Sequence, residues 1–310
     1  MRMGLAAEDF QRIQGWFYRN ARPLDLARWQ FHFENGGQAA VLTALAAYQN
    51  EDGGFGHALE ADCWNPNSSP LTTATAAERL LEIGFENSGH PVIQRMLMYL
   101  DSGAEMDGNT WRNVIVSNND YPHAPWWHTD SDSTSRSIFN PTAILAGFIL
   151  QHADRESRLF GRGLEIAKGL EAVFIMQPEL EMHPLICVLT LLDYIALAGL
   201  QEEFAYAEMQ AAAARRITAL LERDAGDWNG YTCKPSALIH SPAGLGYADN
   251  AAIVEKELDY TLASRNSEGL WSLSWKWEGY EREFAVSENW WKAGIAFDKL
   301  LFLRAFGRLD

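Results

Sequence analysis

Apolar residues recur at helical spacing along most of this chain, and few segments alternate as a strand would. In each predicted helix the apolar side chains stand at positions i, i+3 and i+4, so that they fall on one face. The predicted helices are residues 8–20, 24–34, 37–50, 72–84, 90–101, 140–152, 157–175, 181–198, 202–223, 250–264 and 283–306. Residues 111–116 are expected to form a short strand. The pattern predicts an all-α fold.

The size and composition of the chain favour one domain with a large core. The chain has 310 residues, of which 47% are hydrophobic and 21% are charged, and this is the balance of a folded globular protein. Helical barrels and toroids of this length commonly form a single domain. We therefore expect residues 1–310 to be one domain.

A formal net charge of -16 bears on the partners of the chain. So acidic a protein repels phosphate backbones and anionic lipid headgroups. No apolar run has the length of a membrane-spanning helix or the position of a secretory signal, and the three cysteines fit a reducing compartment. We expect a cytoplasmic protein without a nucleic-acid partner or stable membrane insertion. The oligomeric state is left open.

Two segments share a pattern in which a polar residue is followed by an acid, a glycine and an aromatic residue. They are residues 49–56 (QNEDGGFG) and 265–271 (RNSEGLW), and each follows a predicted helix. The glycine permits the left-handed backbone that ends a helix, the acid can bond the first amides of the next helix, and the aromatic side chain packs beneath. We interpret the pattern mainly as a structural connection between helices.

Residues 49–56 resemble the QW-type repeat of the terpenoid cyclase and protein prenyltransferase superfamily, which includes squalene-hopene cyclases. Residues 268–271 resemble it less closely, because Arg265 stands where that repeat has Gln. The resemblance implies an α/α toroid of inner and outer helices around a central cavity that binds a ligand. The likeness carries fold more than function.

The chemical signatures of that superfamily match in part only. The Asp-x-Asp-Asp acid motif of the cyclases has its nearest counterpart in Glu60-Ala61-Asp62, which offers two carboxyl groups. The zinc-binding Asp-x-Cys pair of the prenyltransferases has no match, because Asp62 and Cys63 are adjacent. No glycine-rich phosphate loop occurs either. We expect neither a metal nor a cofactor.

The densest group of polar residues, 56–70, supplies the candidate catalytic residues His57, Glu60 and Asp62. His57 and Glu60 are three residues apart and share a face if this stretch makes one helical turn. A histidine paired with a carboxylate can act as a general acid or base, and a second carboxylate would tune its pKa. The alternative is a loop held together by local turns.

Twelve tryptophans are an unusual number for a chain of this size. Aromatic side chains in loops can stack on a sugar, enclose an isoprenoid or stabilise a cation, although they also serve as ordinary core. Trp275 and Trp277 would lie on one face of an extended 271–278 segment. The candidate substrate-binding residues are Trp64, Tyr121, His123, Trp126, Trp127, Asn140, Trp228, Tyr231, Trp275 and Trp277.

Three functions fit these observations, and the first two are enzymes. The first is a cyclase-like or prenyltransferase-like toroid that binds an apolar or cationic small molecule and transfers protons through its carboxylates and histidine. The second is a carbohydrate-active toroid, a glycosidase or a lyase, and the third is a ligand-binding or scaffold protein without catalysis. A sealed apolar cavity favours the first, an open groove with exposed tryptophan favours the second, and a filled centre favours the third.

Overall fold

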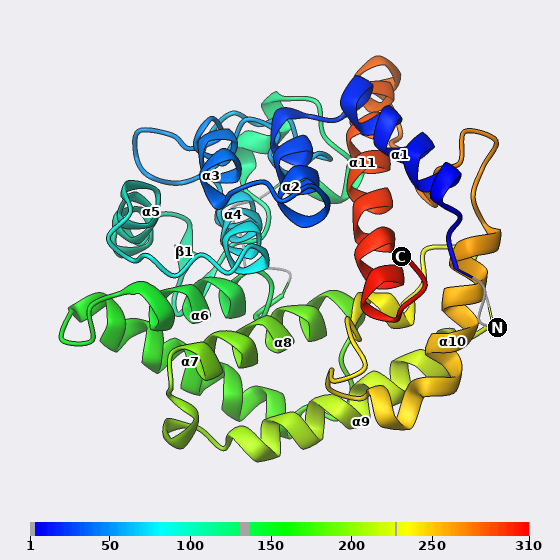
Figure 1. The fold of residues 1–310 in the computed structure, drawn as a ribbon. Coiled ribbons are helices and arrows are strands. Elements are labelled where there is room, and N and C mark those ends of the chain that lie inside the picture. Colours follow the sequence, from blue (N-terminus) through cyan, green and yellow to red (C-terminus); the bar gives the residue numbers. More distant parts are fainter. Residues whose placement is uncertain (1–3, 131–136, 227, 310) are drawn as a thin grey trace. The chain divides into compact units, whose positions relative to one another are not determined.

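The computed structural model describes residues 4–130, 137–226 and 228–309. Across these residues the protein is all-helical, with α-helices α1 to α11 and a single short β-hairpin (Figure 1). Every predicted helix is present, so the all-α prediction is confirmed. The expected strand over 111–116 is wrong, because only Thr110–Trp111 (β2) pairs with Met106–Asp107 (β1) and the chain then turns into a 3₁₀ helix.

The chain divides into two compact units. Unit 1 comprises residues 1–35, 213–276 and 281–310, and unit 2 comprises residues 36–212 and 277–280. The single domain expected from the length stays a prediction.

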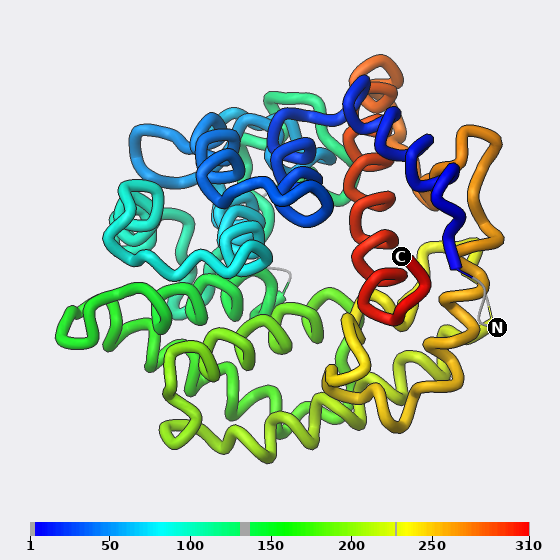
Figure 2. Tube along the Cα trace, viewed as in Figure 1, coloured from blue at the N-terminus to red at the C-terminus, as the bar shows by residue number. Residues whose placement is uncertain are grey.

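Unit 2 is organised around one buried helix, α6. Figure 2 traces the chain from α6 through α7 to α8, which both pack on α6, as does α4. Gly147 of α6 lies against Tyr194 of α8, where a Cβ atom would come within 2.6 Å of the tyrosine ring. The Tyr194 hydroxyl donates to the Ala77 carbonyl of α4 at 3.0 Å, so the three helices are joined at one point. The elements of unit 2 are α3 Gln38–Ala46, α4 Pro70–Glu82, α5 Pro91–Ser102, the β-hairpin, η1 Val116–Asp120, η2 Pro125–Trp127, α6 Thr142–His152, α7 Arg158–Met176, α8 Met182–Leu197 and η3 Gln201–Glu203.

Unit 1 contains helices from both ends of the chain. Trp29 of α2 is fully buried, and its ring lies 4.4 Å from that of Phe17 of α1. At the C-terminus Arg308 donates to Glu255 at 2.8 Å and to Asp259 at 3.1 Å, which fixes the end of the chain to α10. The elements of unit 1 are α1 Ala7–Asn20, α2 Pro23–Phe33, the larger part of α9 Tyr206–Asp224, η4 Pro235–Ala237, α10 Tyr247–Ala263 and α11 Glu281–Ala305.

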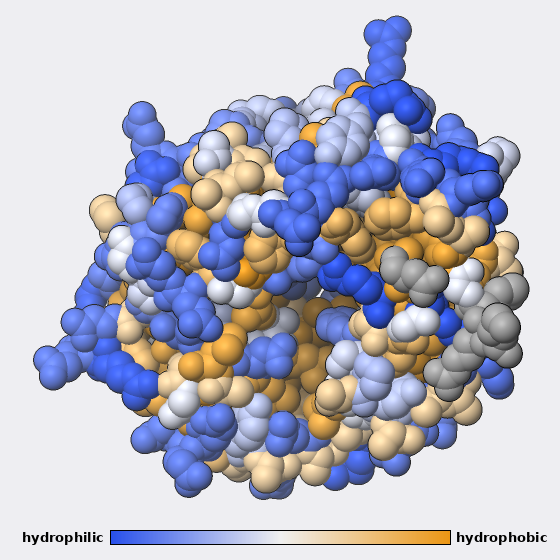
Figure 3. All heavy atoms as spheres, in the orientation of Figure 1, coloured by the Kyte–Doolittle hydropathy of each residue, from blue (hydrophilic) through white to orange (hydrophobic). Residues whose placement is uncertain are grey.

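Hydrophilic and hydrophobic side chains both reach the surface. Figure 3 shows one face of the molecule, on which hydrophilic and hydrophobic side chains are intermixed and some hydrophilic side chains project outward. In the part of the chain that the structure describes, no helix is long and apolar enough to cross a membrane.

The two segments that share a sequence pattern also share a turn. The Asn50 amide donates to the Gly54 carbonyl at 2.9 Å, and the Gly53 amide donates to the Asn50 carbonyl at 3.0 Å. The second segment has the same two bonds, from Asn266 to Leu270 at 2.7 Å and from Gly269 to Asn266 at 2.9 Å. Both glycines have a positive φ, 92° and 83°, which a side chain would strain.

The expected role of the acid in this pattern is wrong for the first turn. Asp52 does not cap the next helix; its Oδ1 accepts from the Gly54 amide at 3.0 Å and from the Ser68 hydroxyl at 2.6 Å. Helix α4 is capped by Ser69, whose hydroxyl accepts from the Thr72 amide at 3.0 Å. The acid thus closes its own turn and holds the residue before the cap.

Candidate functional site

Unit 1 contains a cavity of about 560 Å³. Its walls come from the segment 228–237, from α10, from the segment 271–275 that follows the second turn, and from α11. Its walls contain both aromatic and polar side chains. The lining residues are Trp228, Asn229, Tyr231, Thr232, Lys234, Ser236, Ala237, Tyr260, Ser264, Trp271, Ser272, Leu273, Ser274, Trp275, Ile295, Asp298 and Lys299.

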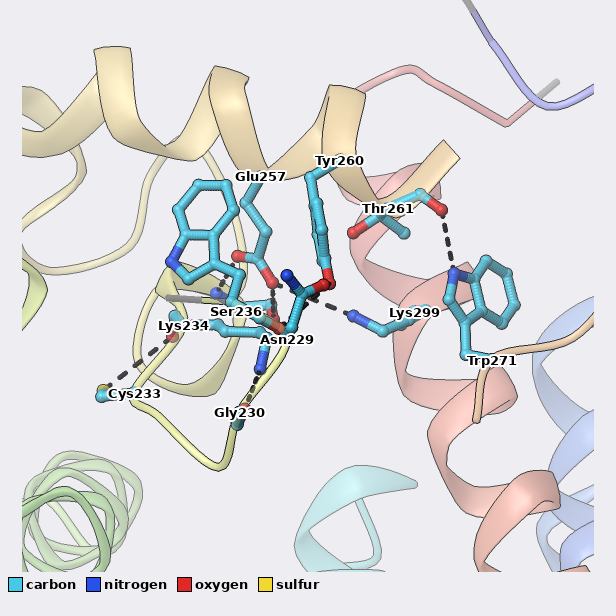
Figure 4. Close-up of polar contacts among 11 residues, drawn as sticks. Asn229, Gly230, Cys233, Lys234, Ser236, Glu257, Tyr260, Thr261, Trp271 and Lys299 are labelled. Atoms are coloured by element: carbon cyan, nitrogen blue, oxygen red, sulfur yellow. Dashed lines mark hydrogen bonds and ion pairs between the residues drawn. The ribbon is translucent and has the colours of Figure 1, made fainter. Parts of the chain in front are cut away.

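A buried carboxyl group, Glu257 of α10, contacts the lining residues Ser236 and Lys299 (Figure 4). Its side chain is fully buried, and both of its oxygens are held by Ser236 of the cavity wall. The Ser236 hydroxyl donates to Oε1 at 2.5 Å, and the Ser236 amide donates to Oε2 at 2.6 Å. The short helix η4 brings Ser236 to this position because it packs against α10.

Lys299 of α11 is the charged partner of Glu257. Its Nζ lies 4.0 Å from Oε1 of Glu257, and 15% of its side chain is exposed. Burial raises the pKa of Glu257, while Lys299 and the bonds from Ser236 oppose that rise. Burial also lowers the pKa of Lys299, against the attraction of Glu257. Both groups are therefore shifted toward their neutral forms, a pattern typical of groups that exchange protons.

The aromatic walls are fixed by bonds from their polar ends. The Trp271 indole donates to the Thr261 carbonyl of α10 at 2.8 Å. The Tyr260 hydroxyl donates to the Trp228 carbonyl at 3.0 Å, and the two rings meet edge to face at 5.5 Å. Trp275 contacts Tyr231 edge to face at 5.7 Å. The walls are thus held in place by α10 and by one another.

Two lining indoles have no acceptor among the described residues. Nε1 of Trp228 and Nε1 of Trp275 are both buried without a hydrogen-bond partner. Both nitrogens are shielded from the accessible space of the cavity, so they face the protein side of its wall.

The structure places three of the predicted substrate-binding residues in this cavity: Trp228, Tyr231 and Trp275. The other predicted site residues belong to unit 2, where none of them lines this cavity. They are His57, Glu60, Asp62, Trp64, Tyr121, His123, Trp126, Trp127, Asn140 and Trp277.

Asp62 is the one predicted catalytic residue whose side chain is buried, whereas His57 is exposed and Glu60 is partly exposed. Oδ1 of Asp62 accepts from the Trp277 indole at 2.8 Å. Its carbonyl accepts from the Ala124 amide at 2.8 Å, and the Trp64 amide donates to the Pro122 carbonyl at 2.9 Å. The 121–128 loop therefore lies along residues 62–64.

His57 does not share a helical face with Glu60, so that expectation is wrong. His57 and Ala58 have φ values of 56° and 58°, which a right-handed helical turn does not allow. The His57 ring bonds the Asn50 side chain at 2.7 Å instead, and Glu60 accepts from the Asp62 amide at 3.3 Å. The alternative of a loop held by local turns describes this stretch better.

The remaining predicted residues have local contacts. His123 is buried and lies between the Tyr121 carbonyl at 2.6 Å and the His128 ring at 3.2 Å. Trp126 is 38% exposed, and the Trp127 indole is buried without a partner among the described residues. The amide of Asn140 donates to the Ser137 hydroxyl at 3.2 Å.

Glu257, Lys299 and Ser236 are not among the residues predicted from the sequence. A signal for the first two was present, because each stands on the apolar face of its helix. Glu257 comes three residues after Val254 and one before Leu258. Lys299 comes three residues after Ala296 and one before Leu300. A charged residue at such a position is buried with a partner or serves a site.

No family model, no curated protein and no solved structure matches this chain. Within residues 4–130, 137–226 and 228–309, no group of three or more His, Cys, Asp or Glu side chains is arranged to hold a metal ion.

Proposed function

We propose that the cavity of unit 1 binds a small hydroxyl-bearing ring compound of the sugar class, and that Glu257 exchanges a proton with it. The observation that carries the proposal is the buried, neutral-shifted carboxyl group beside a cavity with aromatic walls. A carboxylic acid with a raised pKa can donate a proton near neutral pH.

The lining favours a sugar over an isoprenoid. The aromatic rings of Trp228, Tyr231 and Trp275 are of the kind that stacks on the apolar faces of a pyranose ring, and polar side chains also line the cavity. Side chains that can bond ring hydroxyls are Asn229, Thr232, Ser264, Ser272 and Ser274. An isoprenoid offers these polar side chains no ring hydroxyls, so its binding would desolvate them without forming new hydrogen bonds, at a cost in affinity.

The proposal corresponds to the carbohydrate-active alternative, with Glu257 in the role that the sequence suggested for Glu60 and Asp62. The α/α-toroid arrangement, the likeness to terpenoid cyclases and the cytoplasmic location stay predictions from the sequence. The proposal needs none of them.

Binding can be tested with the full chain by titrating a panel of monosaccharides and disaccharides and, separately, farnesol and geraniol, with affinities measured by calorimetry. We expect a sugar to bind and the Trp275→Ala variant to lose at least about tenfold in affinity, because stacking on one aromatic ring contributes on the order of 1 kcal/mol or more. The matched control is Trp126→Ala, which removes an exposed tryptophan of unit 2. Tighter binding of the isoprenoid alcohols, or equal effects of the two variants, would overturn the proposal.

A further inference from the structure

We propose that Lys299 is a carbonyl-reactive amine, which forms an imine with the aldehyde or ketone group of a ligand in the unit 1 cavity. The reactivity of the amine stands on the geometry of unit 1. Only the identity of the carbonyl compound, the open-chain form of a sugar, rests on the proposed function.

The placement of Lys299 differs from that of a lysine in a structural ion pair. Its Nζ is 4.0 Å from the Glu257 carboxylate, beyond hydrogen-bond range, and within the described residues it makes no hydrogen bond. The carboxylate oxygens are occupied by Ser236. Because Lys299 lines the cavity, its amine is available to a ligand.

The second lysine of the cavity is held elsewhere. Nζ of Lys234 donates to the Gly230 carbonyl at 3.2 Å. Its positive charge nevertheless adds to burial in lowering the pKa of Lys299, while Glu257 and Asp298 act in the opposite direction. Desolvation beside a second cation is one of the known ways to obtain a lysine nucleophile at neutral pH.

Lys299 and Glu257 together can complete imine formation without another reactant. The neutral amine attacks the carbonyl carbon, a C–N bond forms, and a proton moves from nitrogen to oxygen to give a carbinolamine. Ser236, which lines the cavity and bonds Glu257, relays a proton from the neutral Glu257 carboxyl group to this hydroxyl group, which leaves as water while the C=N bond forms. The Glu257 carboxylate then takes the remaining proton from nitrogen. The sum is carbonyl plus amine to imine plus water.

The test is reductive trapping of the full chain with glyceraldehyde and cyanoborohydride at pH 7, with peptide mapping by mass spectrometry. We expect the initial rate of labelling at Lys299 to be at least about fivefold higher than at Lys256, because a desolvated amine is more often neutral. Lys256 is the internal control, since it is an exposed residue of α10 in the same unit. A Lys299→Arg variant should lose this label alone, and Glu257→Gln should slow it.

Labelling of Lys299 no faster than Lys256 would overturn the inference, because a buried lysine in a purely structural pair reacts more slowly than an exposed one. The experiment also separates the two proposals. If Lys299 reacts rapidly but no sugar binds, the sugar class fails and the reactive amine stands. If a reducing sugar binds with the same affinity as its alditol and cyanoborohydride traps no covalent adduct, the proposal of a reactive amine fails. The proposal of a sugar site then stands.

Discussion

The turn at 49–56 and the turn at 265–271 have the same backbone bonds and differ in what surrounds them. In the first, the Gln49 side chain donates to the carbonyls of Gly53 and Val92 at 3.0 Å each, and Asp52 bonds Gly54 and Ser68. Polar side chains of this turn therefore bond both the turn itself and two residues outside it, Val92 and Ser68. The turn borders a polar pocket of about 470 Å³, and no tryptophan is among the residues that line this pocket.

The second turn is closed by Asn266, whose side-chain oxygen accepts from the amides of Glu268 and Leu270 at 2.9 and 3.1 Å. Its aromatic residue, Trp271, becomes part of the cavity wall beside Glu257. The comparison teaches that a shared turn motif predicts local backbone and not chemistry. The chemistry comes from the helices next to the turn.

The largest difference between the two regions should appear in catalysis. Glu257→Gln keeps the shape of the side chain but removes its proton, so we expect turnover of the bound sugar to fall by about 10²- to 10⁴-fold. The measurement is the initial rate at which the sugar that binds is converted to product, at a saturating sugar concentration. Glu268→Gln, at an exposed acid of the second turn, is the control and should keep the parent rate. Full activity of Glu257→Gln would remove the distinction between the two regions.

A substitution at the shared glycine tests how rigidly each turn is enclosed. A Cβ atom at Gly53 would lie 2.0 Å from the Arg95 carbonyl oxygen, whereas at Gly269 it would lie 3.3 Å from the flexible Arg12 side chain. Both glycines have a positive φ. We expect Gly53→Ala to cost about 3 kcal/mol or more in the free energy of unfolding and Gly269→Ala about 1 kcal/mol.

Urea denaturation followed by circular dichroism measures both costs. Equal costs, or a larger cost at Gly269, would contradict the view that the first turn is the more tightly enclosed of the two.

The two units should also respond to pH in opposite directions. In unit 2, His152 lies against the Phe148 ring at 4.6 Å and the Ser88 hydroxyl at 3.0 Å, and burial lowers its pKa from 6.5 to about 4. A lowered histidine pKa stabilises the fold above the unfolded value, and this contribution is lost as the pH falls from 6.5 toward 4. We expect a loss of about 3 kcal/mol over this range.

In unit 1 the raised pKa of Glu257 has the opposite effect on how stability changes with pH. Its contribution is present below the unfolded value of 4.5 and is lost as the pH rises through the folded pKa. Thermal unfolding between pH 4 and pH 7 checks both effects. We expect His152→Gln to reduce the fall in unfolding temperature toward pH 4, and Glu257→Gln to reduce the fall toward pH 7. A fall toward pH 4 that is unchanged in His152→Gln would show that His152 is not its cause.

The helices could be predicted because their periodicity is local. Each predicted range overlaps a helix of the structure, and the ends differ by a few residues where turn chemistry intervenes. The range that begins at 202, for example, opens with the 3₁₀ helix Gln201–Glu203 before α9 begins at Tyr206. Caps and short 3₁₀ turns shift such boundaries without changing the helix.

The site was harder to predict because its groups meet only in the folded unit. Trp228, Tyr231 and Trp275 were selected for their type and their place in loops. Glu257 lies in a helix and not in a polar loop, and a single acid on an apolar helix face is a weaker signal than a cluster of polar residues. The bond between Asp62 and Trp277 joins residues 215 positions apart, which no local pattern reveals.

The smallest expected effect is that of a substitution at the first position of the turn, which is Gln49 in one turn and Arg265 in the other. Gln49 bonds two carbonyls, whereas Arg265 pairs with Asp9 of α1 at 2.8 Å, and both of these charged side chains are partly exposed. Ion pairs at such positions contribute little, because solvent screens them. We expect Arg265→Gln to lower the free energy of unfolding by at most about 1 kcal/mol and to leave sugar binding unchanged. Urea denaturation and calorimetry measure the two quantities. A loss of binding in Arg265→Gln would mean that the start of the second turn also shapes the cavity, and the turn would then be part of the site instead of a connection beside it.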